Sequence, residues 1–330
     1  MIPEEKKIAV KNALQTAFGV TEFEDIRAMN AGLSSALIFR MVVKGNPYLL
    51  RVVTRTDAHG DIGRWYGSMK AAADAGLAPK VWYVNMEGRI LITDFIEARS
   101  FPIKQARIIM PEILKRLHLL PAFTHRVNYL DVLSGFIQKL QAAKCLPESI
   151  TDELSREYEQ IKSAYRRIDS DMVSSHNDLK SENFLFDGER VWLVDWEAAF
   201  INDRYFDLAV VANFVAANEQ EEKDYLERYF GREVGEYELA RFFMMRQMLH
   251  VSYFTFFMYL GHAPGEQIEV SLPVSNFRDF SDQVWTGRIT LENNDARQQY
   301  AWVHLEQLKQ NLQSKRFRHS MKIIAEYQTS

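Results

Sequence analysis

The chain has 330 residues, of which 47% are hydrophobic and 25% charged, and its net charge at pH 7 is −4. This length and composition suffice for a sizeable core in one large or two medium domains. The mildly acidic balance argues against a general polyanion-binding surface, so we expect no nucleic-acid partner. The single cysteine, Cys145, excludes an internal disulfide framework.

The N-terminal segment and the most apolar window indicate a soluble protein, which we expect in the cytoplasm. Met1 leads into a charged segment at residues 4–7, and no apolar stretch of the signal-peptide type follows it. The most apolar window, residues 251–260, is too short to span a bilayer. No membrane partner is therefore expected, and the sequence leaves the oligomeric state open.

The first hundred residues alternate between helical and strand patterns. Residues 3–18 have helical periodicity, with apolar side chains on one side at Ile8, Val10, Ala13, Leu14 and Phe18. Residues 29–43 are expected to form a turn of small residues followed by a strand, and a second turn at 44–47 leads into a strand at 48–53. A helix over 61–75 stops at Gly76, and two further strands are expected at 81–84 and 89–97.

The remainder of the chain is mainly helical in pattern. Helices are expected at 108–120, 129–143, 150–168, 219–230 and 238–260, with a final helix or pair of helices at 301–327. A buried helix is also expected to begin at Asp207. The patterns together predict an α+β protein whose strands lie mostly in the N-terminal third.

The chemistry of the chain is concentrated in residues 174–200. Three polar residues stand there among strongly apolar neighbours: Asp178, Asn183 and Asp195. Two short apolar runs separated by Asp187-Gly188 predict a tight β-hairpin, which returns Asp195 close to Asn183. Such a cluster is costly to desolvate unless it binds something, and hard divalent cations prefer oxygen ligands. The spacing therefore predicts a divalent-metal site at one end of the hairpin.

The residues from His176 to Asn183 resemble the catalytic loop of protein-kinase-like phosphotransferases, whose pattern is H-x-D-x-x-x-x-N. Asp195 falls where those enzymes carry the metal-binding Asp of D-F-G, although the triplet here is Asp-Trp-Glu. With the run N-D-R-Y-F-D-L-A at 202–209, the stretch is similar to the aminoglycoside phosphotransferase and choline/ethanolamine kinase group. The resemblance is specific over residues 174–212 and thinner elsewhere.

The resemblance implies a bilobal, protein-kinase-like fold that transfers a phosphoryl group from ATP, with Mg²⁺, to a small hydroxylated molecule. The N-lobe, with the nucleotide-covering sheet and hinge, would comprise residues 1–97. The helical C-lobe, with the catalytic loop and acceptor pocket, would comprise residues 98–330. No activation loop and no A-P-E follow Asp195, since the chain reaches Asp207-Leu208-Ala209 within twelve residues. A protein acceptor is therefore not expected.

The resemblance also assigns roles around the reaction. Asp178 would accept or orient the proton of the acceptor hydroxyl, and Asn183 and Asp195 would hold Mg²⁺. Lys180 could reach the transferring phosphate, although a lysine there often just faces solvent. Further roles fall to three neighbours: Glu197 could contact a second metal or an ammonium group, and His176 and Asp207 would lie behind the site, Asp207 supporting the catalytic loop by hydrogen bonds.

The nucleotide would be held by three parts of the N-lobe. Arg51 occupies the place of the family's ATP-binding Lys, and a guanidinium can bind two phosphate oxygens at once. The loop of Gly32, Ser34 and Ser35 would approach phosphates through its backbone N–H groups, although an ordinary β-turn is an equal alternative. The hinge residues would bind adenine through backbone groups: Asp94, Phe95 and Ile96.

One helix departs from the family's pattern. The family usually carries a Glu there that pairs with the basic residue of the strand, and the expected position is Trp65, with no acidic neighbour. Asp61, one turn earlier, or Asp74 could substitute. If neither does, Arg51 lacks an orienting partner. That departure and the single glycine of the phosphate loop motivate an alternative of another class, a nucleotide-binding pseudokinase that acts as a regulatory module. The intact Asp178, Asn183 and Asp195 argue against it.

The acceptor is the least determined part of the prediction. The Asp-Trp-Glu triplet and Arg51 favour choline, ethanolamine or a similar amino alcohol. An aminoglycoside or a sugar is the alternative within the same chemistry.

Overall fold

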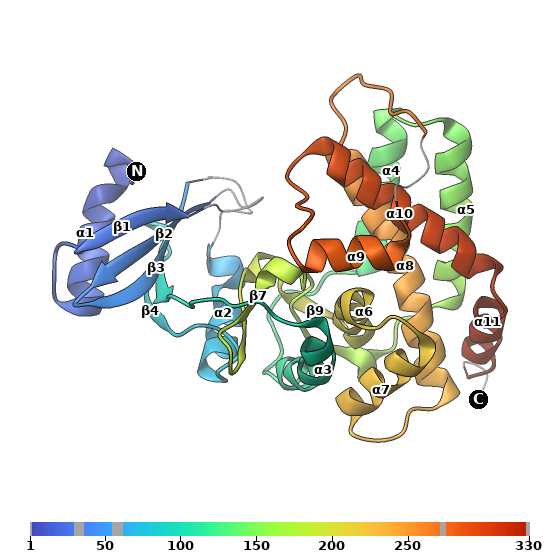
Figure 1. The fold of residues 1–330 in the computed structure, drawn as a ribbon, viewed down its shortest axis with the longest axis horizontal. Coiled ribbons are helices and arrows are strands. Elements are labelled where there is room, and N and C mark those ends of the chain that lie inside the picture. The colour runs from blue at the N-terminus through green and yellow to red at the C-terminus, as the bar shows by residue number, and fades with distance from the viewer. Residues whose placement is uncertain (1, 30–35, 55–61, 271–274, 328–330) are drawn as a thin grey trace. The chain divides into compact units, whose positions relative to one another are not determined.

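The computed structural model of the chain describes residues 2–29, 36–54, 62–270 and 275–327. The chain divides into two compact units, residues 1–100 with 182–199 and residues 101–181 with 200–330 (Figure 1). The first boundary between the units along the chain lies between Ser100 and Phe101. Residues 182–199 belong to the first unit although they lie far along the sequence, so no single cut of the sequence separates the units.

The first unit is built around one antiparallel sheet with the strand order β1-β2-β3-β5-β4. Its elements before residue 100 are α1 (Glu4–Phe18), β1 (Asp25–Met29), β2 (Ala36–Val43), β3 (Asn46–Val53), α2 (Ile62–Asp74), β4 (Val81–Asn85) and β5 (Ile90–Asp94). In the register of the central strands, Arg51 of β3 lies opposite Ile38 on β2 and Leu91 on β5. Strand β1 was not expected from the sequence.

Helix α1 covers one face of this sheet (Figure 1). Because strand side chains alternate between faces, every second residue of the central strands points at the helix. The shared core contains Val10, Ala13, Leu14, Phe39, Met41, Val43, Leu50, Val52, Ile90 and Ile92. Ile8, which we expected on the buried side, is 75% exposed. It precedes Val10 by two residues, about 200° around the helix, so it faces away from the sheet.

The hairpin predicted from the sequence is present in the first unit. Strands β7 (Phe184–Phe186) and β8 (Val191–Leu193) pair antiparallel, with Phe184 opposite Leu193 and Phe186 opposite Val191. The Leu193 N–H donates to the Leu77 carbonyl at 2.8 Å, which attaches the hairpin to the segment after α2. The hairpin is therefore confirmed, whereas β5 ends at Asp94, three residues before the expected end of that strand.

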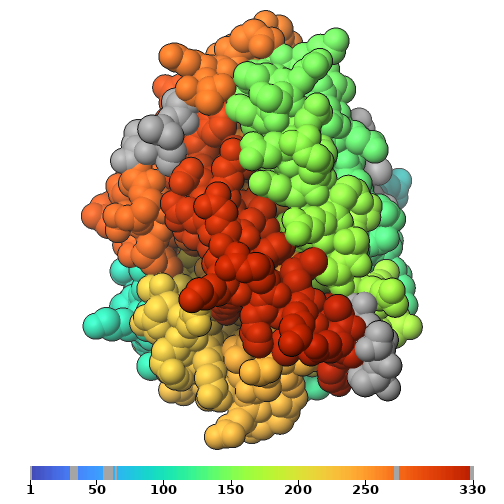
Figure 2. Space-filling model, turned by 90° about the vertical axis from the view of Figure 1, so that its right-hand side faces the viewer, coloured from blue at the N-terminus to red at the C-terminus, as the bar shows by residue number. Residues whose placement is uncertain are grey.

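The second unit is helical and is organised around the long helix α8. Its helices are α3 (Ile103–His118), α4 (Tyr129–Ala143), α5 (Glu148–Ala164), α6 (Arg204–Val215), α7 (Glu219–Phe230), α8 (Glu236–Leu260), α9 (Phe277–Trp285), α10 (Asn294–Gln313) and α11 (Lys315–Tyr327). Helices α4, α5, α6, α10 and α11 pack around α8. Figure 2 shows α10 and α11, in red, crossing one face of this unit beside the green helices α4 and α5.

The predicted α+β class, with an antiparallel N-terminal sheet and a mainly helical remainder, is confirmed. The last segment is a pair of helices, one of the two expected forms. The nine-residue helix α9 was not expected. Among the described residues, no helix has both the length and the apolar character needed to cross a bilayer.

A two-stranded sheet of β6 (Met172–Ser175) and β9 (Phe200–Asp203) leads into the segment that carries Asp178. Val173 lies opposite Asn202, and Ser175 lies opposite Phe200. Helix α6 begins directly after β9, where the Asp203 side chain accepts from the Tyr205 N–H at 2.9 Å and caps the helix. The end of β6 and the start of α6 are thereby set beside each other within the second unit.

Candidate active site

The hairpin of the first unit brings Asn183 close to Asp195. The Val194 N–H donates to the Asn183 carbonyl at 3.2 Å, one step beyond the pairing of Phe184 with Leu193. The approach of these two residues, expected from the spacing, is confirmed. Asp195 has φ 67° and ψ 67°, in the left-handed region that non-glycine residues adopt at a cost. Such strained positions cluster at functional sites.

Arg51 is the cation of this end of the hairpin. Its guanidinium Nη1 and Nη2 lie 3.3 and 3.4 Å from Asp195 Oδ1, and Nη2 also pairs with Glu197 Oε1. Only 9% of the Arg51 side chain is exposed, against 27% for Asp195 and 29% for Glu197. The arginine is therefore held inside the unit, while the two carboxylates that hold it reach solvent.

Trp65 stands where the family's helix Glu was expected. Its ring centroid lies 5.4 Å from the Arg51 guanidinium carbon, so the indole packs against the cation instead of pairing with it through a carboxylate. Asp74, a candidate substitute, pairs with Lys70 one turn away at 2.5 Å on the helix surface. The acidic partners seen for Arg51 thus come from the hairpin segment. Asp61, the other candidate, lies outside the described residues.

The hinge segment contains free backbone groups. Asp94 has its N–H bonded to the Lys80 carbonyl at 3.0 Å, and its side chain accepts from Trp82 Nε1 at 2.6 Å. Among the described residues, the backbone N–H and C=O groups of Phe95 and Ile96 make no hydrogen bond. These two residues could therefore bind a heterocycle edge. Gly32, Ser34 and Ser35, the expected phosphate loop, lie outside the described residues.

In the second unit, Asp207 holds the segment that precedes Asp178. Its carboxylate accepts from the Ser175 hydroxyl at 2.9 Å, the His176 N–H at 2.8 Å and the Asn177 N–H at 2.9 Å. Its side chain is fully buried. Burial alone raises the pKa of this carboxyl, but the hydrogen bond and charge of His118 and the interactions with His176 outweigh it, so the pKa is lowered. Asp207 is therefore an ionised acceptor for three consecutive residues.

The buried network continues behind Asp207. His118 Nε2 lies 3.3 Å from the Asp207 carboxylate, and His118 Nδ1 lies 2.8 Å from the Tyr229 hydroxyl. With both ring nitrogens occupied, His118 links α3 and α7 to the start of α6. This fits the structural role that a lone histidine most often has.

Asp178 itself is accessible. Its side chain is 39% exposed, and Lys180 Nζ lies 3.2 Å from its Oδ2. Its N–H donates to Nδ1 of the buried His176 at 3.4 Å. The carboxylate can therefore meet a hydroxyl from solvent, while its backbone is bonded to the protein interior.

Two residues near Asp178 were not expected from the sequence as site residues, namely Asn177 and Asn202. Asn177, like Asp195, has a positive φ, 65°. Its side chain accepts from Asn202 Nδ2 at 2.7 Å. The available signal was weak: an asparagine directly before the aspartate of H-x-D, and another at the start of the run 202–209.

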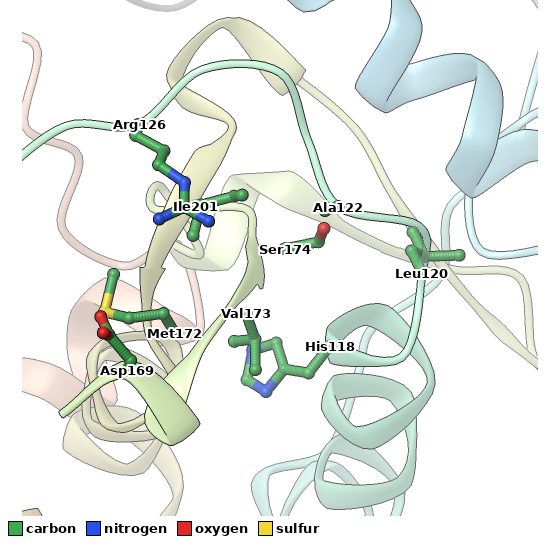
Figure 3. A pocket seen from close by; sticks show the side chains of 9 residues that line it. All are labelled: His118, Leu120, Ala122, Arg126, Asp169, Met172, Val173, Ser174 and Ile201. Carbon is green, nitrogen blue, oxygen red and sulfur yellow. The ribbon is translucent and has the colours of Figure 1, made fainter.

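A cavity of about 360 Å³ lies next to the Asp207 network in the second unit (Figure 3). It is lined by His118, Leu120, Ala122, Arg126, Asp169, Met172, Val173, Ser174 and Ile201. None of these nine lining residues is a predicted site residue. The Ser174 hydroxyl is engaged with the backbone, donating to the Pro121 carbonyl at 2.8 Å. We therefore do not place the acceptor in this cavity.

The donor set at the hairpin fits a magnesium ion. Asn183 offers an amide oxygen and Asp195 a carboxylate, and both are hard oxygen ligands. Among the described residues, no group of three or more His, Cys, Asp or Glu side chains could hold a metal. A sparse set is what Mg²⁺ uses, because it keeps several waters and is completed by substrate phosphates.

Comparisons with known proteins identify the family and the fold of the chain. The model of the phosphotransferase enzyme family matches residues 25–243. The chain therefore belongs to the phosphotransferase enzyme family. Protein LicA of Haemophilus influenzae is 28% identical over 109 residues, which cover 32% of this chain and 31% of that protein. The chain spans about a third of the length of the curated relatives it matches.

Solved structures share the fold at low identity. A choline/ethanolamine kinase family protein from Mesorhizobium loti has a TM-score of 0.66 and 20% identity, over 97% of this chain and 99% of that one. The ternary complex of streptomycin, ATP and APH(2")-IIa has a TM-score of 0.57 and 15% identity, over 80% of this chain and 93% of that one. At these identities the likeness shows the fold.

Proposed function

We propose that the chain transfers the γ-phosphoryl group of ATP, with Mg²⁺, to a hydroxyl group of a small molecule. The observation that carries the proposal is the arrangement at the hairpin. A buried arginine is held there by Asp195 and Glu197, at the end where Asn183 meets Asp195. A guanidinium beside two carboxylates, with an asparagine at the same end of the hairpin, suits a bound Mg²⁺-triphosphate, because the guanidinium can donate to phosphate oxygens and Mg²⁺ takes oxygen ligands.

In this function the first unit binds the nucleotide. Arg51 would bind phosphate oxygens, and the free backbone groups of Phe95 and Ile96 would bind adenine. The loop of Gly32, Ser34 and Ser35 remains our proposal for a further phosphate contact. Asn183 and Asp195 would hold Mg²⁺, which supplies charge neutralisation on the phosphates when bound.

Glu197 takes the role that the family's helix Glu would have. It pairs with the guanidinium of Arg51 and, with the Trp65 ring, limits where the arginine can lie. An oriented Arg51 supports an active enzyme over a pseudokinase, because the missing helix Glu was one of the two reasons to consider one, the other being the loop with a single glycine. Glu197 is then an orienting partner of Arg51 before any contact with substrate.

Asp178 would act on the acceptor. Its exposed carboxylate accepts or orients the hydroxyl proton while the acceptor oxygen attacks the γ-phosphorus. The bond from that phosphorus to the bridging oxygen of ADP breaks, and ADP leaves with the bridging oxygen. The Lys180 Nζ atom lies 3.2 Å from Asp178 Oδ2. From there the ammonium group would contact the phosphoryl group during its transfer. His176 and Asp207 hold the segment from behind.

The acceptor that we favour is choline, ethanolamine or a similar amino alcohol. The Asp-Trp-Glu triplet and Arg51 support it, as does the fold shared with the Mesorhizobium loti protein. An aminoglycoside is the alternative, supported by the shared fold of the streptomycin complex. A sugar would need the same chemistry.

The test is ADP release with Mg²⁺-ATP across choline, ethanolamine, other amino alcohols, sugars and aminoglycosides. We expect turnover with one class, reduced about 100-fold or more by Asp178→Asn, which removes the base and keeps the shape. Asp152→Asn, an exposed aspartate on α5, is the matched control and should change nothing. Nucleotide binding without turnover for any acceptor would favour the pseudokinase, and no nucleotide binding would overturn both.

A further inference from the structure

Asn177, the residue before Asp178, has a left-handed backbone conformation and makes four hydrogen bonds. Its backbone N–H donates to Asp207 Oδ1 at 2.9 Å. Its side-chain Nδ2 donates to the carbonyls of Ser175 and Phe200, both at 3.2 Å. Its Oδ1 accepts from Asn202 Nδ2 at 2.7 Å. The carboxamide uses both of its donor hydrogens and its acceptor, which fixes its rotamer.

Asn202 is placed for this contact by the β6–β9 sheet. It lies opposite Val173, three residues before the start of the catalytic loop at His176, and it is 3% exposed. The carbonyl of Phe200, which Asn177 also contacts, belongs to the same strand. Strand β9 therefore supplies a donor and an acceptor to one side chain of the loop, while Asp207 holds the loop backbone.

We propose that Asn177 and Asn202 form a positioning clamp, which sets the turn before Asp178 and thereby the direction of its carboxylate. The holding of the loop follows from the contacts alone. The catalytic consequence rests on the proposed phosphotransferase function. Neither residue touches the reacting atoms in this scheme, so both act through Asp178.

The choice of residue is physically reasonable. At a φ of 65° most side chains are strained, and Asn is among the few that tolerate this region. Glycine would tolerate it too, but it would leave the turn free to move. Asn combines the conformation with a side chain that locks it. A misplacement of about 1 Å at a reacting group can lower the rate about 100-fold. A fixed turn before Asp178 would therefore keep the rate high by keeping the carboxylate in place.

The first test measures the holding of the loop without any chemistry. In Asn202→Ala, backbone amide exchange in a peptide that covers residues 174–183 should accelerate about tenfold, the factor for one lost hydrogen bond of ordinary strength. Tyr165→Phe is the matched control, because it removes a buried hydrogen bond to the adjacent Asp203 at 2.9 Å and leaves the clamp intact. It should lower the melting temperature comparably without changing exchange in that peptide. Equal exchange in both variants overturns the clamp.

The second test measures positioning. With the acceptor found in the panel, Asn202→Ala should lower kcat about tenfold or more and leave the KM for ATP within about twofold. Asn177→Gly should do the same, and Asn202→Ala in that background should add nothing, because the shared bond is already absent. Additive losses, or an unchanged kcat, would overturn the positioning role.

The two tests separate the clamp from the proposed function. If the wild-type chain turns over no acceptor, the phosphotransferase proposal fails, and the exchange measurement still decides whether the clamp holds the loop. If the wild-type chain is active and exchange does not change, the clamp alone fails.

Discussion

The two units each contain a buried ion at a position to which we assign a role in the proposed function, and they surround it differently. In the first unit Arg51 is 9% exposed, but the Asp195 and Glu197 carboxylates that pair with it are 27% and 29% exposed. In the second unit Asp207 is fully buried, and His118, which pairs with it, is 2% exposed. One ion faces partners in contact with solvent, and the other has its partners inside the protein.

This difference in the exposure of the partners indicates different roles for the two ions. Partners that reach solvent can exchange one bond for another when a ligand arrives, because water and ligand can replace what is lost. A buried ion whose donors are all inside cannot exchange them without leaving a charge unpaired, which is costly. The first arrangement suits binding of a charged substrate, and the second suits a scaffold that keeps its shape through the reaction cycle.

The largest expected effect comes from breaking the closed network. Asp207→Ala removes the acceptor of Ser175, His176 and Asn177 and leaves their donors buried and unsatisfied. We expect a loss of about 3–5 kcal/mol in the free energy of unfolding, as for other broken buried charge networks. Urea unfolding followed by circular dichroism measures it.

Ser175→Ala is the graded comparison for this variant. It removes one donor and leaves the carboxylate with its others, so the expected loss is about 1 kcal/mol. If Asp207→Ala cost no more than Ser175→Ala, the network would not be the closed scaffold described here.

The next effect comes from the open arrangement and concerns activity. Arg51→Gln removes the cation proposed to bind phosphate, and we expect kcat/KM to fall about 100-fold, the size seen when a preorganised donor is lost. Arg51→Lys keeps the charge but cannot bind two phosphate oxygens at once, so its kcat/KM should lie between those of the wild-type chain and Arg51→Gln. The free energy of unfolding should change less than in Asp207→Ala, because water can solvate the half-exposed carboxylates.

Arg27→Gln controls for loss of a sheet arginine, since Arg27 pairs with Asp25 at an exposed position on β1. It should leave kcat/KM unchanged. Equal losses of activity in Arg27→Gln and Arg51→Gln would contradict a specific role for Arg51.

The sequence predicted the parts of this comparison that depend on local pattern. The hairpin follows from two apolar runs and a turn, so the meeting of Asn183 and Asp195 could be foreseen. Most helices were expected because their periodicity is continuous over several turns, and 129–143 and 219–230 agree to the residue. The short helix α9 offered too few turns for such a signal.

The partners of buried polar groups were harder to foresee. Arg51 and Glu197 are 146 positions apart, and their pairing depends on where the fold places the hairpin. Analogy with the family predicts an acidic partner on α2, where Trp65 stands instead. The bond between Asn177 and Asn202 depends likewise on the pairing of β6 with β9. Pattern locates a polar residue, but tertiary structure selects its partner.

A third buried polar group differs from both ions, because it is neutral and incompletely bonded. His250 on α8 and His304 on α10 are fully buried, with their Nδ1 atoms 2.9 Å apart. Among the described residues, neither Nε2 atom has a hydrogen-bond partner. Burial lowers the pKa of His304 to about 3, with a smaller contribution from Arg246, and lowers the pKa of His250 as well.

This pair predicts acid sensitivity, the smallest of the three effects. An unfolded histidine takes up a proton below about pH 6.5, whereas folded His304 stays neutral down to about pH 3. The contribution of His304 to the free energy of unfolding is therefore fully present above pH 6.5 and is lost as the pH falls below it. From pH 7.5 to 5.0 this single group should remove about 2 kcal/mol from the free energy of unfolding. In His304→Gln that loss should shrink by the same amount, whereas His262→Gln, at a partly exposed position, should leave it unchanged. An identical pH dependence in the wild-type chain and His304→Gln would mean that the buried pair accepts a proton without unfolding, and that it is not the rigid, neutral contact between α8 and α10 that the geometry describes.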